Sequence, residues 1–224
     1  TADSTLVDSM YENCHYFKNT GGAASVHTGT VDISGSAKIK NASAVEGGAI
    51  YLSNGNVTMS GGTIEHCTAD FGGAVYVASG DFTMTGGDID HNTANGKNDA
   101  DEEIGEGGAV YVEGGNIYIG KENCADINCL IVSNNTAVNG GAFAVSGSTP
   151  IMHCGKLIGN VAKQKGGALY VSSQSGLGGF TMLGGEINGG EVEANAVLGG
   201  GVYLAGGTYT LDNENAAISG NKAV

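Results

Sequence analysis

Short apolar triplets with a polar or small residue at their centre recur along the whole chain, each just after a pair of glycines. This alternation with a period of two predicts short β-strands and not helices. The glycine pairs begin at positions 21, 47, 72, 107, 140, 166 and 199, within GGAASV, GGAIYL, GGAVYV, GGAVYV, GGAFAV, GGALYV and GGGVYL. The pairs are 25 to 35 residues apart, so the chain is an internal repeat of about 25 residues in which three units are longer.

Each repeat contains two further strand patterns. An apolar triplet recurs as VDI (31–33), VTM (57–59), FTM (82–84), IYI (117–119), FTM (180–182) and YTL (209–211). An apolar residue followed three positions later by Asn recurs in IDHNTA from 89, VSNNTA from 132, LIGNVA from 157 and ISGNKA from 218. Three short strands per repeat, joined by Gly, Asn and Ser turns, predict an all-β protein whose parallel coils stack about 4.8 Å apart. We therefore expect a parallel β-helix, a single-stranded solenoid of about seven to eight coils.

The alternation also assigns the faces of the strands. The first and third residues of each triplet are expected to point inward, at 50/52, 75/77, 110/112, 143/145, 169/171 and 202/204, and on a second wall at 57/59, 82/84, 117/119 and 180/182. Each coil then buries four to six apolar side chains, at roughly 1.5–3 kcal/mol each. One coil alone cannot offset its ordering entropy, but a stack of coils can.

The repeat covers residues 1–224 as a single domain, with insertions near 95–106, 121–130 and 172–179. The final residues ISGNKAV stop where the next glycine pair would begin, and we expect the chain to be a fragment of a longer protein.

The GGA-apolar motif and the apolar-X-X-Asn motif resemble the GGA[ILV] and FxxN repeats of chlamydial polymorphic outer membrane proteins. They are more similar to the adhesin-like β-helix repeat proteins on the surfaces of anaerobic bacteria and methanogens, whose units read much like GGAVYVASGDFTMTGGDIDHNTA (72–94). The resemblance covers nearly all of residues 11–224. It implies a right-handed, pectin-lyase-like β-helix that is extracellular, at the cell surface or secreted, and that acts in adhesion.

Composition and charge limit the classes of partner that the chain is expected to bind. The chain has 41 glycines, one proline and a formal net charge of −14, and all nine of its basic residues are lysine. We do not expect the chain to bind nucleic acid, because it has too few basic side chains to neutralise a run of phosphate charges. No apolar stretch approaches the roughly 18–20 residues that span a bilayer. We expect a monomer without membrane insertion.

Two columns of residues are expected to stack in the third turn of successive coils. The first is an interior asparagine ladder, at Asn92, Asn135, Asn160, Asn195 and Asn221, which would satisfy buried backbone groups. The second contains His66 and His91, which we interpret as polar turn residues.

Cys129 and Cys154 each lie three residues before the apolar residue of their third strand, so they fall in one column of neighbouring coils. A disulfide between them fits a Cα separation near 5 Å. Cys124 competes for the same partner, and free buried thiols are an equally open alternative. No spacing of the five cysteines matches a zinc site.

Two surface features are candidate binding sites. The central residues of five triplets, Tyr51, Tyr76, Tyr111, Tyr170 and Tyr203, form an outward stripe that could stack on sugar rings or dock a protein, although the rings could also simply stack on one another. The loop NGKNDADEEIGE (95–106) carries four carboxylates that could bind calcium, the one cofactor considered: Asp99, Asp101, Glu102 and Glu103.

The function expected is a non-catalytic, adhesin-like module that recognises a host or community glycan or protein. A polysaccharide lyase or hydrolase on the same scaffold is an alternative, as is a structural spacer in a cell-wall protein. Pectin-active enzymes use arginine, which this chain lacks, so an enzyme would need paired carboxylates such as Asp88 and Asp90 with Glu65. No catalytic residue is assigned.

Overall fold

The computed structural model describes residues 4–7, 10–12, 20–124, 126–172, 178–192, 198–212 and 214–223. Every regular element in these residues is a β-strand, and every pairing between strands is parallel. The prediction of an all-β protein with parallel strands is confirmed. No helix long and apolar enough to cross a membrane occurs in this described part of the chain.

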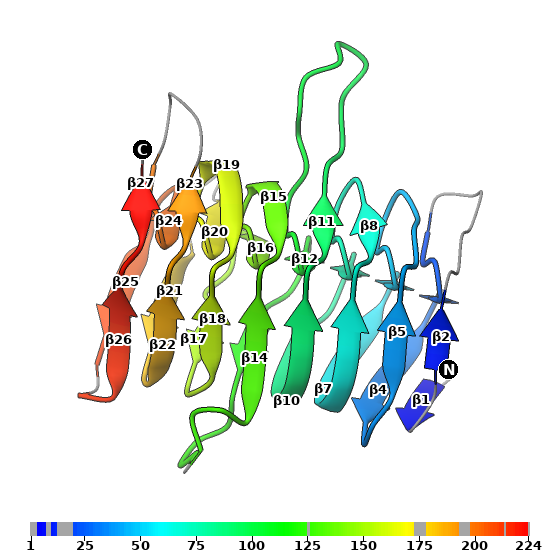
Figure 1. The fold of residues 1–224 in the computed structure, drawn as a ribbon, viewed down its shortest axis with the longest axis horizontal. Coiled ribbons are helices and arrows are strands. Elements are labelled where there is room, and N and C mark those ends of the chain that lie inside the picture. Colours follow the sequence, from blue (N-terminus) through cyan, green and yellow to red (C-terminus); the bar gives the residue numbers. More distant parts are fainter. Residues whose placement is uncertain are drawn as a thin grey trace.

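The strands form three sheets (Figure 1). The seven-stranded sheet contains β3 (Ala24–Val26), β6 (Ile50–Leu52), β9 (Val75–Val77), β12 (Val110–Val112), β16 (Phe143–Ser146), β20 (Leu169–Ser172) and β24 (Val202–Leu204). The six-stranded sheet contains β8 (Thr68–Ala69), β11 (Thr93–Ala94), β15 (Thr136–Asn139), β19 (Val161–Lys165), β23 (Glu191–Val192) and β27 (Lys222–Ala223).

The fourteen-stranded sheet is bent into two walls. Its strands are β1 (Ser4–Val7), β2 (Met10–Glu12), β4 (Gly29–Ser34), β5 (Lys38–Lys40), β7 (Gly55–Glu65), β10 (Phe82–Asp90), β13 (Ile117–Ile119), β14 (Leu130–Ser133), β17 (Ile151–Met152), β18 (Lys156–Ile158), β21 (Gly179–Met182), β22 (Gly185–Asn188), β25 (Thr208–Leu211) and β26 (Ala216–Ser219). The long strands β7 and β10 run through both walls, and the register between them shifts around Gly86.

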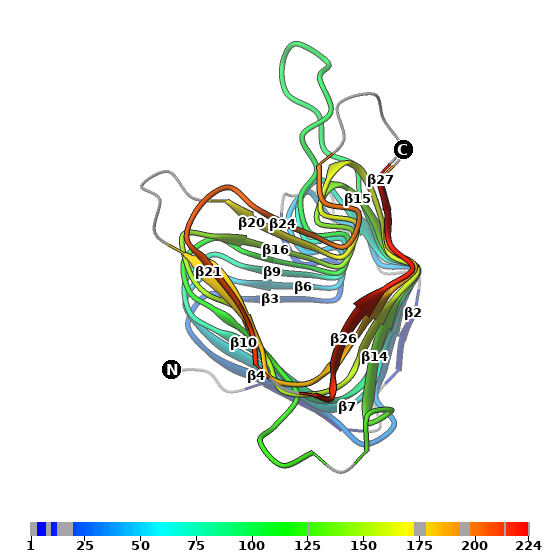
Figure 2. The ribbon, with the colours of Figure 1, turned by 90° about the vertical axis from the view of Figure 1, so that its left-hand side faces the viewer.

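The chain visits the sheets in a fixed order. From β9 in the seven-stranded sheet it passes through β10 and β11, and then returns to β12, which pairs with β9. We call each such passage a rung; β12–β15, β16–β19, β20–β23 and β24–β27 are the next four. Seen along the stack in Figure 2, the rungs superpose and enclose a core between the seven-stranded sheet and the two walls. The six-stranded sheet rises from one edge of the seven-stranded sheet, on the side away from the core (Figure 2).

The predicted inward positions face this core. Ile50, Val75, Val110, Phe143, Leu169 and Val202 are register partners in successive rungs. All of the predicted inward residues except Val202 and Leu204 are fully buried. These two are half-buried, and Tyr209 and Leu211 are 44% and 50% exposed, because they lie in the last rung that the structure describes.

The asparagine ladder is present. The side-chain oxygens of Asn92, Asn135 and Asn160 accept hydrogen bonds from the backbone nitrogens of Cys67, Asn92 and Asn135, at 2.8 to 3.1 Å. The assignment of Asn195 to this column is wrong, because the position in that rung is held by Gly190, whose nitrogen donates to the side chain of Asn221. Asn195 itself lies outside the described residues.

Ala42, Cys67 and Gly190 share the column of the asparagine ladder. The residue before each position of this column adopts the left-handed conformation. The φ angles are 51° at Asn41, 56° at His66, 54° at His91 and 53° at Asn134, and glycines at 159, 189 and 220 take the same role. This conformation favours Asn, His and Gly. His66 and His91 therefore share one column, as expected, with ring centroids 5.1 Å apart.

Candidate functional site

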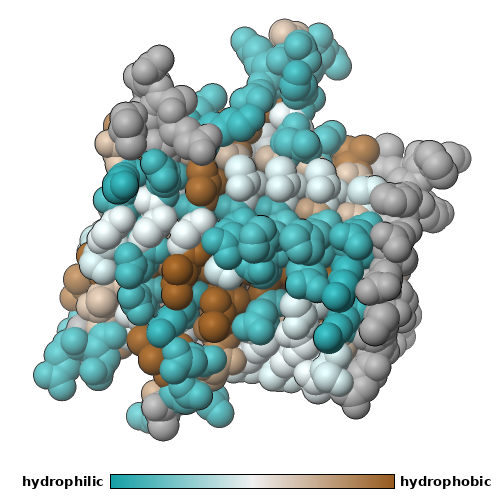
Figure 3. All heavy atoms as spheres, viewed as in Figure 1, coloured by the Kyte–Doolittle hydropathy of each residue, from teal (hydrophilic) through white to brown (hydrophobic). Residues whose placement is uncertain are grey.

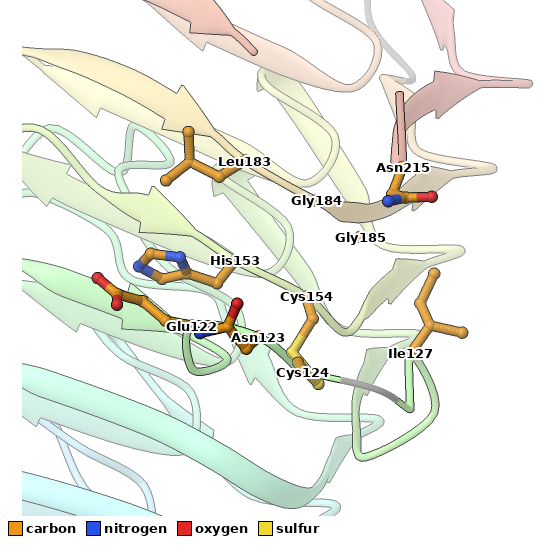
Figure 4. Close-up of a pocket in the computed structure, with 10 residues that line it drawn as sticks. All are labelled: Glu122, Asn123, Cys124, Ile127, His153, Cys154, Leu183, Gly184, Gly185 and Asn215. Atoms are coloured by element: carbon orange, nitrogen blue, oxygen red, sulfur yellow. A yellow bond between two sulfur atoms is a disulfide. The ribbon is translucent and has the colours of Figure 1, made fainter. Parts of the chain in front are cut away.

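The insertion between β13 and β14 borders a surface cleft of about 700 Å³ (Figure 4). Its polar lining comes from the carboxylate of Glu122, the amides of Asn123 and Asn215 and the imidazole of His153, and its apolar lining includes Ile127 and Leu183. Figure 4 draws Glu122 and His153 on one side of the cleft and Ile127 and Asn215 on the other, with a disulfide between them. The insertion projects from the stack in Figure 1, as does the 95–106 loop, and both project as largely hydrophilic surface in Figure 3.

The cleft runs along the stack because successive rungs each contribute to it. His153 follows β17 in the rung after the insertion, Leu183 follows β21 in the next, and Asn215 precedes β26 in the last. A Cβ atom on Gly184 would lie 2.4 Å from the carbonyl oxygen of His153. Glycine at this position, which lines the cleft, therefore lets adjacent rungs approach closely. Neighbouring rungs are about 4.8 Å apart, so the cleft suits an elongated ligand.

Three cysteines meet beside the cleft, and two of them, Cys124 and Cys154, line it. Cys124 and Cys154 form a disulfide with a Cα separation of 6.2 Å. The sulfur of Cys129 lies 3.3 Å from that of Cys124 and 3.6 Å from that of Cys154. Burial raises the pKa of the Cys129 thiol, and the charge of Asp126 raises it further.

The predicted pairing of Cys129 with Cys154 is corrected by this geometry, since Cys124 takes the bond and Cys129 keeps a free thiol. The column behind the prediction exists: β14 and β18 pair Ile131 with Lys156, which aligns the two cysteines two positions earlier. The insertion folds back along the stack and brings Cys124 to the same point. The sequence analysis left Cys124 as a competitor for the same partner, and spacing could not decide the pairing because Cys124 lies outside the repeat.

The predicted tyrosine stripe lies on the outer side of the seven-stranded sheet, but its rings cover one another. Tyr51 and Tyr76 stack with centroids 5.5 Å apart, as do Tyr170 and Tyr203 at 5.7 Å, while Tyr111 meets Tyr76 edge-on at 5.2 Å. Tyr76 is only 6% exposed and Tyr170 9%. Ala144 interrupts the stripe between Tyr111 and Tyr170. The rings therefore offer little face area to a sugar.

A second column borders these rings. It consists of the residues just before the glycine pairs, which form bridges from rung to rung: Glu46, Phe71, Glu106, Asn139, Lys165 and Leu198. Phe71 contacts Tyr111 with centroids 6.0 Å apart, and the Lys165 ammonium lies over the rings of Tyr170 and Tyr203 at 5.9 and 5.5 Å. Burial raises the pKa of Glu106 to about 6, against the opposing effects of Asn139 and Lys165.

The four carboxylates predicted to bind calcium in the 95–106 loop are not brought together. Asp101 pairs with Lys97 at 2.8 Å, Glu102 accepts from the Asn98 amide at 2.8 Å, and Glu103 pairs with Lys163 at 2.5 Å. Asp99 is exposed. Within the described residues, the only group of three or more His, Cys, Asp or Glu ligands close enough to share one ion is the cysteine cluster. Calcium binding by this loop stays a prediction.

The carboxylates considered for catalysis lie on the outer face of the second wall. Asp90 is half-buried; burial alone would raise its pKa, but hydrogen bonds from Ser133, His91 and Asn134 outweigh burial and lower it. Partial loss of solvent around the Asp88 carboxylate raises its pKa, and the charge of Asp90 raises it further. Glu65 is the register partner of Asp90 and pairs with Lys40 at 2.8 Å.

The insertion near 172–179 falls largely on residues 173–177, which lie outside the described residues. Comparison of the chain with protein-family models, with curated proteins and with solved structures found no match.

Proposed function

We propose that the chain is part of a right-handed parallel β-helix that acts as a non-catalytic, adhesin-like binding module at a cell surface or in the secreted fraction. We infer that it holds a neutral glycan in the cleft beside the 121–130 insertion. The observation that carries this proposal is the polar cleft itself, which spans several rungs and is built from a departure from the repeat.

The order of the strands supports the β-helix. Each rung passes through the three sheets in the same sequence, and each strand pairs in parallel with its counterpart in the next rung. The inward columns and the asparagine ladder are fully engaged in packing and hydrogen bonding. The regular positions are thus used to stabilise the stack, and recognition falls to the loops, as is common on rigid scaffolds.

The chemistry of the lining supports a glycan. Glu122, Asn123, His153 and Asn215 supply donors and acceptors suited to a hydroxyl-rich ligand, while Ile127 and Leu183 supply apolar surface for the carbon-bound hydrogens of a sugar ring. The net charge of −14 disfavours an anionic polysaccharide. The disulfide fits an oxidising, extracellular setting.

A glycan array with the wild type, two matched glycine variants and His153→Ala tests the proposal. Asn123 and Asn41 both have left-handed backbone, with φ of 54° and 51°. Glycine keeps that conformation at either site, so Asn123→Gly removes an amide from the cleft and Asn41→Gly removes one elsewhere. We expect Asn123→Gly and His153→Ala to weaken binding about tenfold, and Asn41→Gly to leave it unchanged. An array without hits, or equal binding by all variants, would count against the cleft.

A polysaccharide-cleaving activity is the second candidate, because the pKa values of neighbouring Asp88 and Asp90 are shifted in opposite directions. When the pKa values of two neighbouring carboxyl groups differ in this way, the group with the higher pKa can act as general acid and the other as general base. Incubation of a bound glycan with wild type, Asp88→Asn and Asp90→Asn would decide: release of shorter products by the wild type alone would establish catalysis.

A further inference from the structure

We propose that Cys124, Cys129 and Cys154 form a binding site for one thiophilic metal ion, such as Zn²⁺, Cd²⁺ or Cu⁺, when the Cys124–Cys154 disulfide is reduced. The disulfide and the metal are then alternative ways of fastening the 121–130 insertion to the stack.

The positions of the sulfur atoms carry this inference. The Cys129 sulfur lies 3.3 and 3.6 Å from the other two, and all three lie within 4.8 Å of one another. A tetrahedral zinc–thiolate site with Zn–S bonds of about 2.3 Å places its sulfurs about 3.8 Å apart. Two of the three separations are therefore near those of a thiolate site, and only the bonded pair must move apart.

Two of the ligands lie beside strands of the stack, and the third lies further into the insertion. Cys129 precedes β14, and its carbonyl accepts a hydrogen bond from the nitrogen of Gly87 in the rung before. Cys154 lies between β17 and β18, and a Cβ atom on Gly120 would come within 2.5 Å of its sulfur, so glycine there makes room for that sulfur. Cys124 lies between β13 and β14, and the disulfide joins it to Cys154.

The charge balance and the open position also fit. Three thiolates and a divalent ion carry a net charge of −1, and Lys121 belongs to the same insertion. Cys124 and Cys154 both line the cleft. A fourth ligand, water or a group on a cleft-bound molecule, can therefore reach the ion from the cleft, as in zinc sites with three protein ligands.

The chemical steps balance with a dithiol as the reductant. The dithiol transfers two electrons and two protons to the Cys124–Cys154 bond and becomes a disulfide itself. The divalent ion then displaces three protons from the three thiols as it binds. Soft sulfur ligands select zinc, cadmium or copper(I) over calcium and magnesium.

A titration with Cd²⁺ tests the site. A background variant with Cys14→Ala and Cys67→Ala keeps only the three cluster cysteines, and its oxidised and dithiol-reduced forms are titrated with Cd²⁺ after removal of the reductant. We expect one ion per chain in the reduced form, with thiolate-to-metal charge-transfer absorption and protection of three thiols from alkylation. The oxidised form should show neither change.

Cys129→Ser in that background is the decisive variant. It leaves the Cys124–Cys154 disulfide in place, so an unchanged circular dichroism spectrum and melting temperature in the oxidised form verify its fold. After reduction it should bind Cd²⁺ at least about 100-fold more weakly, since loss of one ligand removes several kcal/mol of binding free energy. Absence of stoichiometric binding by the reduced background protein, equal binding by Cys129→Ser, or equal binding by the oxidised form would each overturn the proposal.

Discussion

The side-chain oxygen of Asn135 accepts two hydrogen bonds from Asn92 in the preceding rung, one from the backbone nitrogen at 2.8 Å and one from the side-chain nitrogen at 3.0 Å. The Asn135 amide nitrogen in turn donates to the carbonyl of Ile89 at 3.0 Å. Both asparagines are fully buried. A buried backbone nitrogen needs a hydrogen-bond acceptor. At this column the acceptor is the side-chain oxygen of the asparagine in the next rung.

Substitution of Asn135 by alanine should therefore lower the stability of the stack markedly. The change leaves the buried Asn92 nitrogen and the Ile89 carbonyl without these partners, and each unsatisfied group costs about 1–3 kcal/mol. We expect the free energy of unfolding, measured by urea denaturation, to fall by about 2–4 kcal/mol. The exposed Asn41→Gly variant is the control and should stay within about 0.5 kcal/mol of the wild type.

The second glycine of each pair is required by close approach between rungs. A Cβ atom on Gly73 would lie 2.2 Å from the carbonyl oxygen of Gly108, whereas one on Gly147 would meet nothing within 4 Å. Gly73→Ala should thus push two rungs apart and give misfolded or insoluble protein. Gly147→Ala should lower the free energy of unfolding by only about 1 kcal/mol, because alanine is less stable than glycine in the left-handed conformation. Comparable melting temperatures for the two variants would refute this account.

The sequence repeats predict the strands and their faces because stacking imposes one requirement on every rung. Alternation alone places Val75 and Val77 inside, and the glycine pairs mark the same turn each time. The repeats do not predict the positions of residues in the insertions. Cys124 sits in an insertion whose path depends on tertiary contacts, so its bond to Cys154 was only one of several open pairings.

The tyrosine stripe illustrates a second limit. Sequence spacing correctly puts Tyr51, Tyr76 and Tyr111 in one column, but it does not determine how the rings tilt. Their stacking on one another, and the bordering Phe71, reduce the area they expose. Glu106 borders the same rings with a raised pKa that depends wholly on its burial in the folded chain, which spacing does not reveal.

Glu106 should make stability depend on pH between about 4.5 and 6. Its pKa is about 6 in the folded protein, above the ordinary value of 4.5. The folded state therefore binds the proton more tightly, and this stabilisation is complete below pH 4.5 and is lost as the pH rises through 6. The shift corresponds to about 2 kcal/mol. Glu106→Gln should remove this loss, so that the difference in unfolding free energy between variant and wild type grows by about 2 kcal/mol from pH 4.5 to 7. A constant difference would show that Glu106 titrates normally.

Reduction of the Cys124–Cys154 disulfide should destabilise the chain even without metal. The bond joins residues 30 positions apart, and a loop of that size restricts the unfolded chain by about 3–4 kcal/mol at 25 °C. In the presence of a chelator, we expect a dithiol to lower the urea midpoint of the wild type. Cys124→Ser should have this lower midpoint from the start and should not respond to the dithiol. If reductant lowers the midpoint of Cys124→Ser as much as that of the wild type, the stabilisation comes from another pair of thiols. Addition of Cd²⁺ to the reduced wild type should then restore part of the lost stability, because an ion that binds only the folded chain shifts the equilibrium toward it.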